Sequence, residues 1–114
     1  MTGFYHRRVA YDEALAGRVR AALRGIGITE KKMFGGLVFM TGGHLTVGVY
    51  GDGLIARIGA EEMAAVAEPG VRPFQMGGRA MSGIVLVPAE TLDDSALDSW
   101  IARARHHVAS LPPR

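Results

Sequence analysis

Apolar residues recur along the chain with two different periods, and each period predicts a different kind of element. Near the beginning, the chain shows the spacing of three and four residues that places apolar side chains on one face of a helix, at Leu15, Val19, Ala22, Leu23 and Ile26. We therefore predict a first amphipathic helix over residues 11–24.

The end of the chain carries the strongest helical pattern. Asp93 is placed to cap the helix N-terminus, and Leu92 is placed to pack against the first turn. The apolar face predicted for this last helix consists of Leu97, Trp100, Ile101, Ala104, Val108 and Leu111.

The segment between these helices has the composition and the glycine-rich turns that are typical of strands. We predict strands over residues 33–40, 44–50 and 54–58, and tight turns between consecutive strands make them an antiparallel meander. The residues predicted to share the core side of the second strand are Leu45, Val47 and Val49.

The remaining segments complete the predicted order. A short helix is expected at residues 60–67, with Met63 and Val66 facing inward, and a weak strand at 72–76. A clear strand at 83–88 is apolar on both faces, which indicates a place in mid-sheet with both sides covered. The predicted fold class is α+β: an antiparallel sheet with helices packed against it, in the order helix–three strands–helix–two strands–helix.

Size and composition limit the classes of protein to which the chain can belong. Its 114 residues, 48% hydrophobic and 21% charged, suit a single folded domain, which we place at residues 11–114 after a basic leader at 1–10 expected to lack fixed structure. The sequence has no cysteine, which excludes disulfides and thiol catalysis. It has neither an export signal nor an apolar run of the ~20 residues that a membrane span needs, so we expect a cytoplasmic protein that does not bind membranes.

No motif indicates catalysis, a metal or a cofactor. Of the four histidines, His106 and His107 are neighbours whose side chains diverge on a helix, so they cannot share one metal ion. The acidic pairs 61–62 and 93–94 each open a predicted helix, where backbone N–H groups favour negative charge. We therefore expect a protein that is not an enzyme.

Two glycine pairs and two arginines leave both a structural and a functional interpretation open. Gly35-Gly36 lies inside an apolar run, where a bulge or a close backbone approach would require glycine. Gly77-Gly78 precedes Arg79 and could form a turn or, with that arginine, hold an anion. Arg57 shares a strand face with Ile55, so it needs a carboxylate partner if that face is covered and is a surface contact if it is open.

Taken together, these residues resemble the N-terminal domain of the TfoX/Sxy family, the regulators of natural competence. The resemblance rests on the string 32–36 after an amphipathic helix, on 78–83 before an apolar strand, and on the closing stretch around Trp100. It implies an α+β fold of the secretion-chaperone-like type in a cytoplasmic bacterial protein without known catalytic activity. Competence regulators carry a second, C-terminal domain, which is absent before Arg114, so a stand-alone domain is expected. The family's signature positions in this sequence are Met33, Phe34, Gly35, Gly36, Gly78 and Arg79.

Three functions remain in ranked order. The first is a regulatory or protein-interaction module that binds an unknown protein partner or a second copy of itself through strand edges or helix faces. The second is nucleic-acid binding, motivated by Arg7, Arg8, Arg18, Lys31 and Lys32 and weakened by a net charge of only +2. The third is a small-anion binder or enzyme that uses Arg57 and Arg79 as a clamp.

Overall fold

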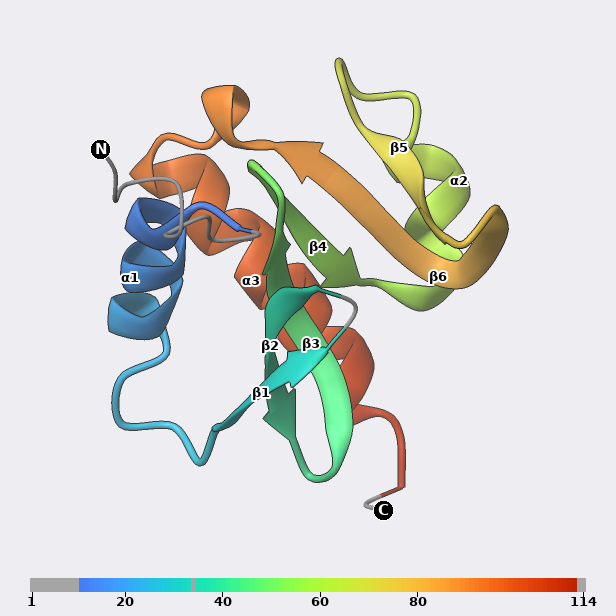
Figure 1. Ribbon diagram of the computed structural model, residues 1–114. Helices are drawn as coiled ribbons and strands as arrows, with labels where there is room; N and C mark the ends of the chain where they lie inside the picture. Colours follow the sequence, from blue (N-terminus) through green and yellow to red (C-terminus); the bar gives the residue numbers. More distant parts are fainter. Residues whose placement is uncertain (1–10, 34, 113–114) are drawn as a thin grey trace, which may run out of the picture.

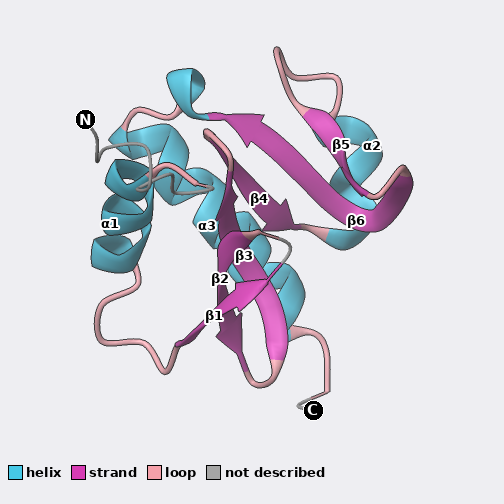
Figure 2. Ribbon diagram, viewed as in Figure 1, coloured by secondary structure: helices cyan, strands magenta, loops and turns pink. Residues whose placement is uncertain are grey.

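The computed structural model describes residues 11–33 and 35–112, which form three helices and one six-stranded antiparallel sheet (Figures 1 and 2). The expected basic leader at residues 1–10 and the signature residue Phe34 lie outside the described residues. The elements are α1 Glu13–Ala22, β1 Thr29–Met33, β2 Gly36–Thr41, β3 His44–Tyr50, β4 Gly53–Arg57, α2 Glu62–Ala65, β5 Arg72–Met76, β6 Arg79–Pro88 and α3 Asp94–Ala109.

The sheet has the strand order β1-β2-β3-β4-β6-β5. Consecutive strands are therefore neighbours except where α2 intervenes, and the β5–β6 hairpin then joins the sheet through β6. The α+β class is confirmed, and so are the strand at 72–76 and the mid-sheet position of β6.

The predicted strand count is wrong by one, because the apolar run 33–40 contains a turn. Met33 pairs directly with Gly36, so β1 ends and β2 begins within this run, and the order is helix–four strands–helix–two strands–helix. The sequence pattern misses β1 because its first four residues are all exposed and polar, so they show no hydrophobic alternation.

The predicted facing of β3 is also wrong at one residue. The register shifts between Phe39 and Met40, which pair with Val47 and Leu45, so Thr46 is the extra residue of a β-bulge. The bulge turns Leu45 away from Val47 and Val49 and into a second apolar cluster on the opposite face. A bulge interrupts the period of two, which is why alternation alone places Leu45 on the wrong side.

The main core lies between the sheet and the helices. Val19 of α1, Ala104 of α3 and Val47, Leu54 and Val85 of the sheet are fully buried in it. Asp12 and Asp93 cap α1 and α3 by accepting hydrogen bonds from the amides of Leu15 and Ala96, which confirms the predicted cap at Asp93.

The short helix differs from its prediction. A 3-10 turn, Gly59–Glu61, leads into α2, and Ala65 is the residue that α2 buries. Met63 is predicted to face inward, but its side chain is 82% exposed. The helix is only one turn long, so a single position suffices to anchor it and Met63 is left on the outside.

Among the described residues, no helix combines the length and the hydropathy that crossing a membrane requires.

Candidate functional site

One face of the sheet receives no residue from any described helix. A second apolar cluster lies there, and every member comes from a strand, whereas the main core draws on all three helices. In Figure 1, α3 passes behind β3 and β4, and no helix crosses in front of them. We call this surface the helix-free face; its apolar residues are Met33, Val38, Met40, Leu45, Tyr50, Ile55, Phe74, Met76, Met81, Ile84 and Leu86.

A pocket of about 450 Å³ opens on the helix-free face. Its lining comes from β1, β2, β3, β4 and β6, so the sheet must curve around it for β1 and β6 to reach the same space. A pocket of this size falls within the range of ordinary ligand sites. The lining residues are Met33, Met40, Gly43, Leu45, Arg57, Ala80, Met81, Ser82 and Ile84.

Arg57 is the only charged residue of that lining. Its Nη1 lies 3.5 Å from Nδ1 of His44, and Nε2 of His44 lies 2.6 Å from the carbonyl oxygen of Pro112. A carbonyl only accepts, so Nε2 carries the proton and donates, and Nδ1 is left to accept from the guanidinium. The described residues give Arg57 no ion-pair partner, although Ile55 on the same strand face is 1% exposed. Arg57 is partly buried, contacts His44 and lines the pocket, so its charge is left without a carboxylate among the described residues.

A second, smaller groove continues the helix-free face toward β5. It measures about 360 Å³ and is lined by Tyr50, Arg72 and Leu86, among others. The rings of Tyr50 and Phe74 meet edge to face there with centroids 5.1 Å apart. β6 is predicted to be covered on both faces, but Leu86 is only half-buried and borders this groove.

Charge is distributed unequally across the six strands. Their single acidic residue is Glu30, whereas they carry Lys31, Arg57, Arg72 and Arg79, along with Lys32. Directly paired residues of an antiparallel sheet share a face. Lys31 pairs with Val38, Arg72 with Leu86, and Arg79 with Met76, so all three cations lie on the helix-free face with Arg57.

The two glycine pairs have structural roles. Gly77 and Gly78 both have positive φ, 62° and 79°, and form the two-residue turn of the β5–β6 hairpin, as the right-handed twist of such hairpins favours. Gly36 lies so close to β3 that a Cβ there would overlap the carbonyl oxygen of Val49. The strand ends beside the two hairpin turns both border the 450 Å³ pocket, through Met33 and Ala80.

Arg57 and Arg79, the two arginines of the predicted anion clamp, do not line the same pocket. Arg57 pairs with Ile84 of β6, five positions along the strand from Arg79, and Arg79 does not line the pocket that contains Arg57. The two arginines share a face of the sheet without converging on one small site.

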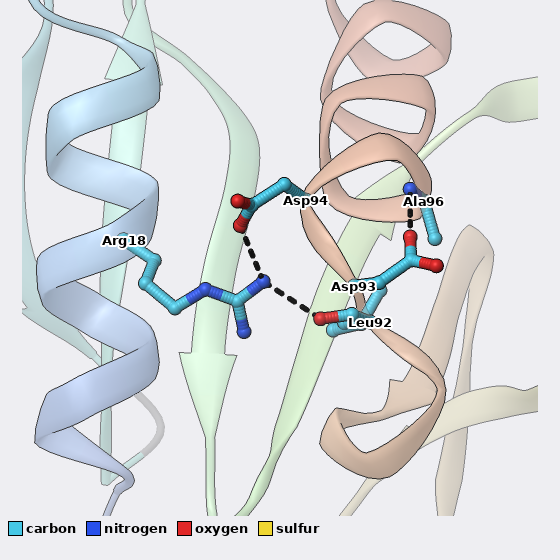
Figure 3. Close-up of polar contacts among 5 residues, drawn as sticks. All are labelled: Arg18, Leu92, Asp93, Asp94 and Ala96. Carbon is cyan, nitrogen blue, oxygen red and sulfur yellow. Dashed lines mark hydrogen bonds and ion pairs between the residues drawn. The ribbon is translucent and has the colours of Figure 1, made fainter.

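On the helical side, three arginines are held by carboxylates, and Figure 3 shows the first of them, Arg18. Nη2 of Arg18 donates to Oδ1 of Asp94 at 3.2 Å and to the carbonyl of Leu92 at 2.7 Å, which ties α1 to the start of α3. Arg103 pairs with Glu61 and Glu68 and covers the ring of Trp100 at 4.0 Å. Arg18 is therefore engaged within the fold, which removes one cation from the set that suggested nucleic-acid binding.

The pair of Arg20 and Glu30 has a predictable pH signature. Nε and Nη2 of Arg20 donate to the carboxylate of Glu30 at 2.6 and 2.9 Å, and these hydrogen bonds lower the pKa of Glu30 and raise that of Arg20. A lowered folded-state pKa means that the stabilisation is present above the unfolded value of about 4.3 and disappears as the pH falls through the folded value. We expect Arg20→Gln to return the pKa of Glu30 toward that unfolded value, measured by carbon-detected NMR of its carboxyl group; an unchanged pKa would contradict the pairing.

Within the described residues, no group of three or more histidine, aspartate or glutamate side chains is arranged to hold a metal ion. Sequence reasoning singles out Arg57 but misses Met40, Met81 and Arg72, which border the same face. The sequence signal for this surface is the charge of the strands, which carry five basic residues and one acidic residue. The signal can be counted only when the first and last residue of each strand are known.

Comparison with known proteins gives one match. The family model of the TfoX N-terminal domain matches residues 21–108 of the 114, a stretch that contains the whole helix-free face. No curated protein and no solved structure matches the chain. Because the family model covers well over half of the sequence, the chain belongs to the TfoX N-terminal domain family.

Proposed function

We propose that this domain is a non-catalytic regulatory module that acts by binding another protein, in the manner of a competence-regulator-like domain. The observation that carries the proposal is the helix-free face, an apolar surface with two adjoining grooves and no described helix over it. Five apolar residues of this face are buried, and the six around them, four of which are methionines, stay partly exposed because no described helix covers them. Partly exposed apolar surface that borders a groove is typical of interaction sites.

The side chains of this face suit a protein partner. Met33, Met40, Met76 and Met81 are all partly buried on it, so four of the six methionines in the chain gather at one surface. Methionine is unbranched and polarizable, which lets it adapt to the shape of an incoming side chain. Membership of the TfoX N-terminal domain family supports a regulatory role for that contact.

Strand edges, the contact sites suggested by sequence analysis, are less suitable. The outer edge strand β1 carries Lys31 and Lys32, and the other edge strand, β5, contains Pro73. Lysine and proline on edge strands are the usual means of preventing edge-to-edge pairing. The face of the sheet is therefore the surface that we propose for the contact.

Nucleic-acid binding is the less favoured alternative. Sequence-tolerant binding to single strands needs aromatic rings on which bases can stack. Phe74 is 1% exposed, and Tyr50 packs edge-on against it. Arg18 and Arg20 are engaged with Asp94 and Glu30.

The proposal is tested by affinity capture of the tagged domain from lysate of its own source cells, with and without nuclease, read by mass spectrometry. We expect at least one stoichiometric protein that survives nuclease treatment. Partners that vanish with nuclease, or nucleic acid alone in the eluate, would replace the proposal with nucleic-acid binding.

A further inference from the structure

The helix-free face combines an apolar floor with a ring of cations. Lys31, Arg57, Arg72 and Arg79 lie on this face by register, and none has an ion-pair partner among the described residues. Glu30, the one acidic residue of the strands, pairs with Phe39 of the main core and therefore points to the helical side, where Arg20 holds it. An occupant of this face thus meets apolar side chains and positive charge without any carboxylate from the strands.

The charge argues against a second copy of this chain as the occupant. A two-fold interface brings the same patch of both copies together, so each copy would present four unneutralised cations to the other. Like charges opposed across an interface disfavour that pairing. The complementary occupant carries carboxylates beside apolar side chains.

The protected edges decide the shape of the occupant. Strand addition would need a free edge, and β1 and β5 are protected by Lys31, Lys32 and Pro73. Polyproline segments dock in aromatic-lined grooves, and the 450 Å³ pocket has no aromatic residue in its lining. An amphipathic helix laid into an apolar groove is the mode that fits this face better. Such a helix would lie on the helix-free face as α1 and α3 lie on the other.

The spacing of two arginines fits this mode. Arg57 pairs with Ile84, and Arg72 pairs with Leu86, on the two strands that flank β6. With strands about 4.8 Å apart and a rise of about 3.3 Å per residue, the two Cα atoms are roughly 12 Å apart. Two turns of helix rise about 10.8 Å, so carboxylates at positions i and i+7 can reach both guanidinium groups.

We propose, as a deepening of the proposed function and resting on it, that the helix-free face binds an acidic amphipathic helix of a partner protein. Its apolar side chains enter the methionine-lined pocket and the smaller groove beside Tyr50, and its carboxylates pair with Arg57 and Arg72. Arg57 sits at a partly buried position inside the pocket, so its pairing with a carboxylate is shielded from solvent and contributes more than an exposed surface pair.

The probe is a fluorescein-labelled synthetic 18-residue helix of leucine, alanine and glutamate, with a leucine stripe and glutamates seven residues apart. A matched probe has lysine in place of every glutamate. We expect fluorescence anisotropy to show binding of the glutamate helix and at least about tenfold weaker binding of the lysine helix, since like charges then oppose each other. Equal affinity for the two probes, or no binding of the glutamate helix, would overturn the proposal.

Charge-reversal variants locate the contact. Arg57→Glu with Arg72→Glu should weaken binding of the glutamate helix about tenfold or more and improve binding of the lysine helix. Arg24→Glu with Arg105→Glu makes the same change in net charge at exposed positions of the helical side, and it should leave both affinities within about twofold. Equal losses in the two double variants would mean that net charge alone drives binding, which refutes a docked helix.

Two further measurements keep the outcome interpretable. Arg57 contacts His44, so its replacement also removes a contact within the fold. The double variant Arg72→Glu with Arg79→Glu changes only exposed arginines of the same face and is therefore tested alongside. Thermal unfolding followed by circular dichroism checks that each variant is folded. Competition with a 15-residue oligothymidylate that displaces the glutamate helix at equal concentration would assign the face to nucleic acid instead. If lysate capture finds a nuclease-resistant partner but the glutamate helix does not bind, the partner chemistry is wrong while the proposed function stands; if neither binds, both fail.

Discussion

Gly36→Ala should destabilise the fold by about 3 kcal/mol or more. We expect this to be the largest loss among glycine-to-alanine substitutions at the described residues. The new Cβ would overlap the carbonyl oxygen of Val49, which belongs to the backbone of the neighbouring strand and cannot rotate away. Relief requires β2 and β3 to separate at the point where Leu37 pairs with Val49. Domains of this size have total stabilities of about 5–15 kcal/mol, so a substantial fraction would be lost.

Urea unfolding followed by circular dichroism measures the effect, and Gly17→Ala is its matched control. Gly17 lies in the middle of α1, exposed, where an added Cβ would meet no packed neighbour within 4 Å. There the same change should stabilise by about 0.5–1 kcal/mol, because alanine favours helix over glycine. A loss below about 1 kcal/mol for Gly36→Ala would show that the hairpin is not packed as described, and that the signature glycine has another role.

Trp100→Ala should cost about 3–5 kcal/mol. Trp100 is the only tryptophan of the chain, 5% exposed, and it packs in the main core beneath the guanidinium of Arg103. Its removal leaves a cavity between α3 and the sheet and also releases Arg103, which bridges to Glu61 and Glu68 beside α2. We expect α2 to loosen together with α3.

Because the substitution removes the only tryptophan, circular dichroism rather than intrinsic fluorescence must follow the unfolding. Met63→Ala truncates an 82% exposed side chain on α2 and should change stability by less than about 0.5 kcal/mol. Comparable losses in the two variants would contradict the core assignment. A loss confined to α3, with amide exchange in α2 unchanged, would contradict the coupling through Arg103.

The helices are predictable because their apolar residues are buried with a regular period. Asp93 caps α3 as expected, and five of the six residues assigned to its apolar face are buried, Leu111 being half-buried. β1 is not predictable in this way, because Thr29 to Lys32 form an exposed edge whose pairing depends on the partner strand and not on burial. Leu45 fails for a related reason: the bulge at Thr46 arises from pairing between strands, which a single-strand period does not encode.

The candidate surface is only partly predictable. The sequence identifies Arg57 as a residue whose role depends on whether its strand face is covered, and the fold supplies that answer. The gathering of Met33, Met40 and Met81 around it brings together three strands that the sequence separates by up to 48 positions, from 33 to 81. Such convergence follows from topology and sheet curvature, which local patterns do not specify.

The central claim is that the helix-free face is the contact surface, and two methionines allow a direct test. Met81 lines the pocket on that face, whereas Met63 is exposed on α2 outside it. Lysate capture after nuclease treatment is repeated with Met81→Glu and with Met63→Glu, which make the same chemical change on the two surfaces. We expect Met81→Glu to lose the stoichiometric partner and Met63→Glu to retain it, with both variants folded by circular dichroism. Retention of the partner by Met81→Glu together with its loss in Met63→Glu would place the contact on the helical side and contradict the claim.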